Sequence, residues 1–133
     1  EYLAGNGVDV SELKLADASG LSRLNMVTVA GFTAFLGRIS KKKFFGAYLA
    51  SLPYPADPAA TGHIKRMGAN TRLEGLLKIK SGSLNGVRGY AGYLTTKKGK
   101  LLTFTSIINN YTAPAAEIDR LHEAFLLELI EKY

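Results

Sequence analysis

Apolar residues recur at near-helical spacing over residues 28–39, and Thr28 stands where a side-chain oxygen can cap the first turn. A basic run then leads into aromatic and apolar residues at 44–49, which predicts a second, shorter helix that ends before Pro53. The prolines that follow impose a loop, and residues 61–67 predict one or two further helical turns. The first half of the chain is therefore expected to consist of helices joined by loops.

The second half of the chain begins with the pattern of β-strands. Residues 76–81 alternate between apolar and polar side chains, and residues 87–96 and 101–109 are rich in β-branched and aromatic residues. The turn between the last two segments contains Gly99 at a position that needs a positive φ. These segments predict three consecutive antiparallel strands, whose aromatic residues we expect in the core: Tyr90, Tyr93 and Phe104.

A long helix is predicted after Pro114, with apolar residues on one face and charged residues on the other. The residues assigned to the apolar face are Ile118, Leu121, Phe125, Leu129 and Ile130. Helices, three strands and a final helix predict an α+β fold, a three-stranded antiparallel sheet with flanking helices. Because such a sheet has two open edges, a further segment of the same domain is expected to complete it.

The composition allows one modest core, since 47% of the 133 residues are hydrophobic. No apolar run approaches the roughly 20 residues of a bilayer-spanning helix, so a soluble piece without a transmembrane segment is expected. The absence of cysteine excludes thiolate sites, and neither His63 nor His122 has a second ligand at a metal-binding spacing. No metal and no cofactor are therefore expected. The chain starts at Glu1 with no leader pattern, which predicts a processed or excised piece.

Two motifs carry the candidate chemistry: Asp17-Ala18-Ser19-Gly20-Leu21-Ser22-Arg23 and Lys80-Ser81-Gly82-Ser83. In this order and at this spacing they resemble motifs of the low-molecular-mass penicillin-binding proteins with inserted domains, which are serine-type D-alanyl-D-alanine carboxypeptidases and endopeptidases. In that family an Asp-Gly-Ser-Gly-Leu-Ser-Arg segment precedes a Lys-Thr-Gly box on the strand beside the active-site cleft. The resemblance covers residues 8–110. Ala18 stands where Gly is usual, and Ser81 stands where Thr is usual but keeps the hydroxyl.

The resemblance implies a role for five residues. Lys80 would place a fixed positive charge beside the terminal carboxylate of the substrate and the reacting groups, and the Ser81 hydroxyl would bind that carboxylate. Gly82 lacks a side chain, so a substrate backbone can lie against the strand. The N–H of Ser83 would form half of an oxyanion hole, and its hydroxyl would join the carboxylate contacts. Arg23 would bind the free carboxylate of a diaminopimelate side chain.

The family also needs a Ser-x-x-Lys nucleophile motif and a Ser-x-Asn motif, both upstream of the first motif described above. Ser11 and Ser40 each begin a literal Ser-x-x-Lys, but neither has the expected context of a helix start in an active site. Residues 1–133 are therefore expected to form the carboxy-terminal segment of a penicillin-binding, β-lactamase-like transpeptidase domain. The rest of that catalytic domain would be its partner.

The expected reaction is hydrolysis of the terminal D-Ala-D-Ala bond of peptidoglycan stem peptides through a serine acyl-enzyme, with cleavage of cross-links left open. β-Lactam antibiotics would bind the same site, and the isolated chain would be inactive. This function implies a periplasmic or otherwise extracytoplasmic location.

Two alternatives stay open. A serine β-lactamase-like hydrolase would share the Lys80 motif, although the motif from Asp17 to Arg23 argues against it. A small basic nucleic-acid-binding module is the other alternative, because 17 basic and 11 acidic residues leave a net charge of +6. The basic run at 41–43 lacks interleaved aromatic residues, so nucleic acid is not the expected partner.

Overall fold

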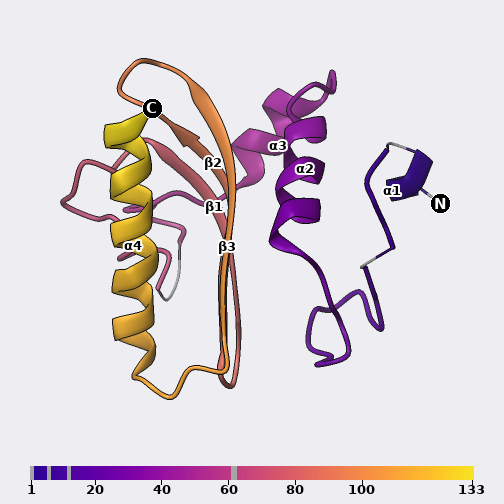
Figure 1. Ribbon diagram of the computed structural model, residues 1–133. Coiled ribbons are helices and arrows are strands. Elements are labelled where there is room, and N and C mark those ends of the chain that lie inside the picture. The colour runs from indigo at the N-terminus through magenta and orange to yellow at the C-terminus, as the bar shows by residue number, and fades with distance from the viewer. Residues whose placement is uncertain (1, 6, 12, 61–62) are drawn as a thin grey trace.

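The computed structural model describes residues 2–5, 7–11, 13–60 and 63–133. Its sheet has three antiparallel strands in the order β1-β2-β3, with α4 on one face and α2 and α3 on the other (Figure 1). The prediction of an α+β fold, a three-stranded antiparallel sheet with flanking helices, is therefore confirmed. The elements in chain order are α1 (Tyr2–Gly5), α2 (Val29–Ile39), α3 (Phe45–Ser51), β1 (Leu77–Leu84), β2 (Val87–Thr95), β3 (Leu101–Asn109) and α4 (Ala115–Lys132).

The two helices on one face begin and end as their sequences predict. Thr28 caps α2 by accepting the N–H of Gly31 at its hydroxyl oxygen, at 3.1 Å. Helix α3 ends at Ser51, two residues before Pro53. Tyr93 of β2 joins this layer to the sheet, because its hydroxyl donates to the carbonyl oxygen of Leu36 at 2.9 Å. Burial raises the pKa of Tyr93 to about 12, so the hydroxyl stays a donor.

The other face of the sheet carries the main apolar core. Side chains from all three strands pack there against α4 and against the loop before β1. The largest contributions are fully or nearly fully buried: Leu73, Leu77, Ile79, Tyr90, Leu94, Phe104, Leu126 and Ile130. The expected burial of Tyr90, Tyr93 and Phe104 is thereby confirmed.

Glycines allow a close approach of two strands and a tight turn in the sheet. A Cβ atom added at Gly92 of β2 would lie 2.1 Å from the carbonyl oxygen of Lys78, so the β1 and β2 backbones approach more closely than any side chain permits. Gly99 in the turn between β2 and β3 has φ of 75°, as its position in the turn predicts.

The buried face of α4 differs from its prediction. Leu121 and Phe125, which were assigned to the apolar face, are 55% and 40% exposed, whereas His122 is buried. The buried residues of α4 form a row at intervals of four: Ile118, His122, Leu126 and Ile130. The polar residue His122 occupies one place in that row because it has a polar partner on the sheet. Apolar periodicity could not reveal this.

Of the one or two helical turns predicted over residues 61–67, the structure has one hydrogen-bonded turn at 63–67 and no assigned helix; residues 61 and 62 lie outside the described residues. The N–H of Met67 donates to the carbonyl oxygen of His63 at 3.0 Å, which closes one turn. Gly68 then has φ of 68°, so the helical path stops there. Within the described part of the chain, no helix has the length and apolarity needed to span a bilayer.

Candidate functional site

The second motif lies on β1, at one edge of the sheet. Lys80, Ser81, Gly82 and Ser83 occupy the half of the strand nearer the turn to β2, directly opposite Ala91, Tyr90, Gly89 and Arg88. Four of the five predicted site residues therefore lie on β1, an edge strand of the sheet (Figure 1).

Hydrogen bonds at the start of β1 show which backbone groups face the open edge. The N–H of Ile79 turns away from β2 and donates to the carbonyl oxygen of Pro53 at 2.9 Å. Because these directions alternate along an antiparallel strand, the N–H and C=O groups of Ser81 and Ser83 also point to the open edge. The strand therefore presents backbone donors and acceptors to any chain that lies beside it.

Lys80 adds a positive charge to the same edge. Its side chain is exposed, and its ammonium group donates to the carbonyl oxygen of Ser81, which faces away from β2. Gly82 leaves the neighbouring surface open, since a Cβ atom built there would meet nothing within 4 Å. A cation, an outward N–H and an uncovered backbone thus lie within four residues.

A cleft of about 620 Å³ lies against this half of the strand. One wall consists of Lys80 to Leu84 with the neighbouring part of β2, and the opposite wall is mostly apolar and comes from α2 and α3. The apolar wall includes Phe32, Leu36, Tyr48 and Leu52. Such a cleft can hold an extended peptide-like molecule whose backbone pairs with β1 and whose carboxylate meets the cation.

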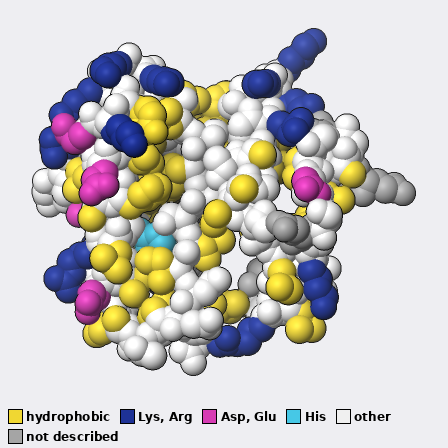
Figure 2. All heavy atoms as spheres, in the orientation of Figure 1, with side chains coloured by type: hydrophobic (Ala, Val, Ile, Leu, Met, Phe, Trp, Pro, Cys, Tyr) yellow, Lys and Arg dark blue, Asp and Glu magenta, His cyan; other side chains and the backbone are white. Residues whose placement is uncertain are grey.

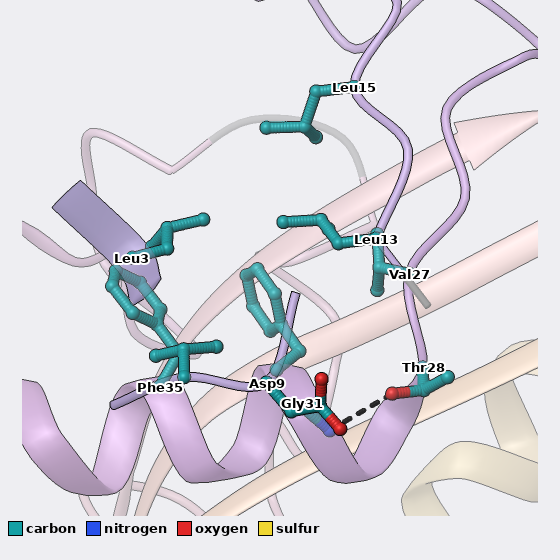
Figure 3. A pocket seen from close by; sticks show the side chains of 10 residues that line it. Leu3, Asp9, Leu13, Leu15, Val27, Thr28, Gly31 and Phe35 are labelled. Carbon is teal, nitrogen blue, oxygen red and sulfur yellow. Dashed lines mark hydrogen bonds between the residues drawn. The ribbon is translucent and has the colours of Figure 1, made fainter. Parts of the chain in front are cut away.

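A neighbouring hollow of about 240 Å³ has a different character (Figure 3). Apolar side chains from α1, the segment after it and α2 surround it, and Asp9 is its charged group. Among the described residues that line it, none belongs to either motif. The hollow therefore offers no counterpart to the charged edge of β1.

The first motif forms a loop organised by Asp17. Its carboxylate accepts the N–H groups of Gly20 and Ser22, both at 3.0 Å, and the side-chain amide of Asn25 at 2.7 Å. The hydrogen bond from Asn25, together with the bonds from the loop, holds the pKa of Asp17 below its usual value. The carboxylate fixes the loop that leads to Arg23.

Arg23 reaches the end of β1 from this loop. Its guanidinium donates to the carbonyl oxygen of Asn85, two residues beyond Ser83, at 2.9 Å. Arg23 is exposed and lines a polar hollow of about 420 Å³ that also includes Leu84. The structure therefore places Arg23 at the same end of the sheet as Lys80 to Ser83, although it lies far from them in the sequence.

Sequence reasoning missed a polar cluster behind the same half of the sheet. Asp119 of α4 accepts two hydrogen bonds from Arg88, at 2.7 and 2.6 Å, and one from the Tyr90 hydroxyl at 2.7 Å. Burial tends to raise the pKa of Asp119, but the hydrogen bonds from Arg88 and Tyr90 outweigh it and lower the pKa. Burial, reinforced by the hydrogen bond to Asp119, raises the pKa of Tyr90.

Two histidines border this cluster. The Nδ1 atom of His122 lies 2.8 Å from the hydroxyl of Ser106 on β3, and the rings of His122 and His63 both pack against Tyr90. Burial lowers the pKa of both histidines, and the positive charge of Arg88 adds to this effect. The sequence signal for the cluster was Arg88, a charged residue at a core-facing position in the alternation of β2.

The literal Ser-x-x-Lys motifs lie away from these groups. The Ser40 hydroxyl donates to the carbonyl oxygen of Gly37 at the end of α2. Ser11 is exposed, and its N–H donates to Asp9; Glu12 of that motif lies outside the described residues. In the part of the chain that the structure describes, no three His, Asp or Glu side chains are grouped as a metal site.

The charged surface has no dominant basic patch on the face shown in Figure 2. Lys and Arg side chains lie around the periphery, and hydrophobic side chains gather over and beside α4. The positive net charge is thus spread out on this face.

Solved structures of penicillin-binding proteins have the same fold. The structure of penicillin binding protein 4 from Haemophilus influenzae matches with a TM-score of 0.85 and 28% identity, over 98% of this chain and 30% of that chain. A second structure of that protein, in complex with a beta-lactam, matches with a TM-score of 0.86 and 28% identity, over 99% of this chain and 32% of that chain. A predatory peptidoglycan endopeptidase from Bdellovibrio bacteriovorus, at 19% identity and a TM-score of 0.72, shares the fold over 98% of this chain and 35% of its own.

Curated relatives are similar in sequence. A D-alanyl-D-alanine carboxypeptidase from an Actinomadura species is 35% identical over 117 residues, which are 86% of this chain and 22% of the relative. The carboxypeptidase DacB from Haemophilus influenzae is 30% identical over 112 residues, 83% of this chain and 23% of the relative. The chain thus spans less than a quarter of either. The model of the D-Ala-D-Ala carboxypeptidase 3 (S13) family matches residues 1–126. The chain therefore belongs to the D-Ala-D-Ala carboxypeptidase 3 (S13) family.

Proposed function

We propose that this chain forms the carboxy-terminal part of the catalytic domain of a serine-type D-Ala-D-Ala carboxypeptidase. The carrying observation is the open edge of β1, where Lys80, the outward N–H of Ser83 and the nearby Arg23 border one end of the sheet. Membership of the family and similarity to curated carboxypeptidases support the reaction.

The reaction requires groups that stabilise negative charge beside a reacting carbonyl. The ammonium group of Lys80 supplies positive charge at the edge, and the N–H of Ser83 donates to the oxyanion of the tetrahedral intermediate. The N–H of the nucleophilic serine supplies the second donor. Lys80 and Ser83 thus act on the reacting atoms.

Substrate binding uses the same strand and the loop beside it. The stem peptide lies along β1 as an added strand, close to Gly82, and its terminal carboxylate accepts hydrogen bonds from the hydroxyls of Ser81 and Ser83. Arg23 binds a second carboxylate, that of a diaminopimelate side chain. Arg23 donates one N–H to the carbonyl oxygen of Asn85, so its other N–H groups remain for the substrate.

The nucleophile and the Ser-x-Asn motif come from the rest of the catalytic domain, outside these 133 residues. Ser40 serves the end of a helix, and Ser11 lies in an exposed loop, so neither fits the role. The small share of the relatives' length that this chain spans supports this division. The isolated chain is therefore inactive.

A peptidoglycan substrate places the working enzyme outside the cytoplasmic membrane. β-Lactams, which acylate the nucleophile of such enzymes, meet Lys80 and the two serines of β1 through their own carboxylate. One structural neighbour was solved in complex with a beta-lactam, which supports beta-lactam binding by the complete domain.

Covalent labelling by a fluorescent penicillin tests the proposal. The 133-residue chain is compared by intact mass with the longer polypeptide encoded in the same reading frame. We expect an adduct on the longer polypeptide alone, lost when Lys80 is replaced by Ala. An adduct on the short chain would make Ser11 or Ser40 a nucleophile. If neither folded polypeptide is labelled, or if no longer polypeptide is encoded, the proposal is wrong.

A further inference from the structure

We propose that Asp119 is a positioning residue, which holds the substrate-facing half of β1 through Arg88 and Tyr90 of β2. The inference rests on the proposed function, because it concerns the groups of β1 that would contact the substrate. Asp119 itself lies on α4, across the sheet layer from the cleft, and it does not touch the reacting atoms (Figure 1).

The register of the sheet connects Asp119 to two of these groups. Ser83 lies directly opposite Arg88, and Ser81 lies directly opposite Tyr90. Directly opposed residues of an antiparallel pair share a face and form its unit of side-chain contact. Both residues of β2 that stand behind the two serines are thus bound by one carboxylate.

The residues between these two pairs explain why an anchor is needed. Gly82 lies opposite Gly89, so no side chains pack across the strands at the centre of this half. Glycine weakens a strand because it has no side chain to pack and more backbone freedom to lose. The local register must therefore be fixed by the pairs on either side.

The anchor is strong because Arg88 and Tyr90 are buried and both donate to the same carboxylate. Arg88 is 6% exposed and Tyr90 is 1% exposed, and the carboxylate binds the guanidinium through two parallel hydrogen bonds. Bidentate pairs of this kind fix geometry as well as contributing energy. Without Asp119, Arg88 would remain as a buried cation without its counter-ion, a state that structures relieve by moving.

Helix α4 extends the same connection to β3. Tyr90 lies opposite Ser106, and Ser106 hydrogen-bonds to His122, which follows Asp119 by three residues on α4. One turn of α4 therefore holds polar side chains on β2 and β3 at the level of Ser81. The other half of β1 is held by apolar packing, so α4 controls the two halves by different means.

The consequence for the reaction concerns geometry more than affinity. An oxyanion donor must lie within a few tenths of an ångström of its position, and a misplacement of about 1 Å costs about 100-fold in rate. Loss of the carboxylate in Asp119→Ala should lower the rate constant of acylation by about 10-fold to 100-fold. The non-covalent affinity for penicillin, which uses several contacts, should change much less.

The test uses the longer polypeptide and two measurements. Stopped-flow acylation by a fluorescent penicillin separates the rate constant from the affinity, and residue-resolved hydrogen exchange compares Gly82 and Leu84 with Lys78. These three N–H groups point toward β2 and so report the ladder itself. The matched control is Glu131→Gln. Glu131 lies on the same helix, and its carboxylate pairs with Lys97 and Arg72 at the other end of the sheet.

We expect Asp119→Ala to slow acylation and to speed exchange at Gly82 and Leu84 but not at Lys78, with Glu131→Gln unchanged. Unchanged acylation and exchange would overturn the inference, and so would faster exchange along the whole strand, which indicates a general structural role. If Asp119→Ala does not fold, Asp119→Asn, which keeps one acceptor, is expected to show the same pattern more weakly. If the wild-type polypeptide never reacts with penicillin, but Asp119→Ala still speeds exchange at Gly82 and Leu84, the anchor is supported and the proposed function is overturned.

Discussion

The two halves of β1 belong to one strand but are stabilised in opposite ways. Leu77 and Ile79 in the first half are 1% and 0% exposed and lie in the apolar core under α4. Ser81 and Ser83 in the second half face an open edge, with a polar cluster behind them. The comparison teaches that a single strand can be buried in the core at one end and open at its edge at the other, and that this change can occur within two residues.

The largest effect on stability should come from the core half. Ile79→Ala removes a fully buried side chain and leaves a cavity, so we expect a loss of about 2–5 kcal/mol in the free energy of unfolding. Ser83→Ala in the exposed half is the matched control and should stay within about 0.5 kcal/mol of the wild type. Urea denaturation measures both, and equal losses would contradict the division of the strand.

Substitutions at two glycines test the same comparison, with a smaller expected loss of stability. Gly92→Ala brings a Cβ atom to 2.1 Å from the carbonyl oxygen of Lys78, and the strands must separate to relieve the overlap. We expect a destabilisation of about 1–3 kcal/mol, measured by thermal or urea unfolding. Gly82→Ala, where the new atom meets nothing within 4 Å, should leave stability nearly unchanged while weakening the labelling of the longer polypeptide by penicillin. A stable Gly92→Ala variant would show that the strands tolerate a wider spacing.

The sequence predicted most of the burial in the core half of β1. It predicted little of the polar cluster that lies behind the other half. Alternation identified Leu77 and Ile79, because apolar burial follows a period of two in a strand. The Asp119 cluster depends on which residues of β2 oppose which residues of β1, and on the rotation of α4. Neither is encoded in a local pattern, and the exposure of Leu121 shows that the rotation was predicted wrongly.

The site divides along the same line. A resemblance to known motifs predicted Lys80 and Arg23 as site residues, but it did not predict that Arg23 would donate to the turn after β1. The role of Asp17 as the organiser of its loop also needed coordinates, since its partners are backbone N–H groups. Sequence patterns point to residues, while hydrogen-bond partners come from the folded backbone.

A fall in pH is expected to reduce the free energy of unfolding moderately, because a histidine of the polar cluster titrates. Burial lowers the pKa of His122 below its ordinary value of 6.5, so the folded state keeps the ring neutral while the unfolded state binds a proton. This contribution is complete above pH 6.5 and is lost as the pH falls through the lowered pKa. The free energy of unfolding should therefore be smaller at about pH 5.5 than at about pH 7.5.

The variant His122→Asn tests the source of this pH dependence. It removes the titrating ring, so the difference between the two pH values should shrink, although His63, whose pKa is lowered in the same way, keeps part of it. The variant should also be less stable at both pH values, because the ring contact with Tyr90 is lost. An unchanged pH dependence would assign the effect to other groups.

The smallest effect on stability is expected beyond the end of β1, at Arg23. Its side chain is exposed and holds the strand turn through one hydrogen bond, so Arg23→Lys should change the free energy of unfolding by less than about 0.5 kcal/mol. Lysine keeps the charge but loses the planar pair of donors that binds a carboxylate in two places. In the longer polypeptide, kcat/KM should fall for a stem peptide with a free diaminopimelate carboxylate and stay constant for a peptide that lacks it. An equal fall for both peptides would mean that Arg23 acts through the Asn85 turn and not on the substrate, which would extend the structural role of the loop to the binding half of β1.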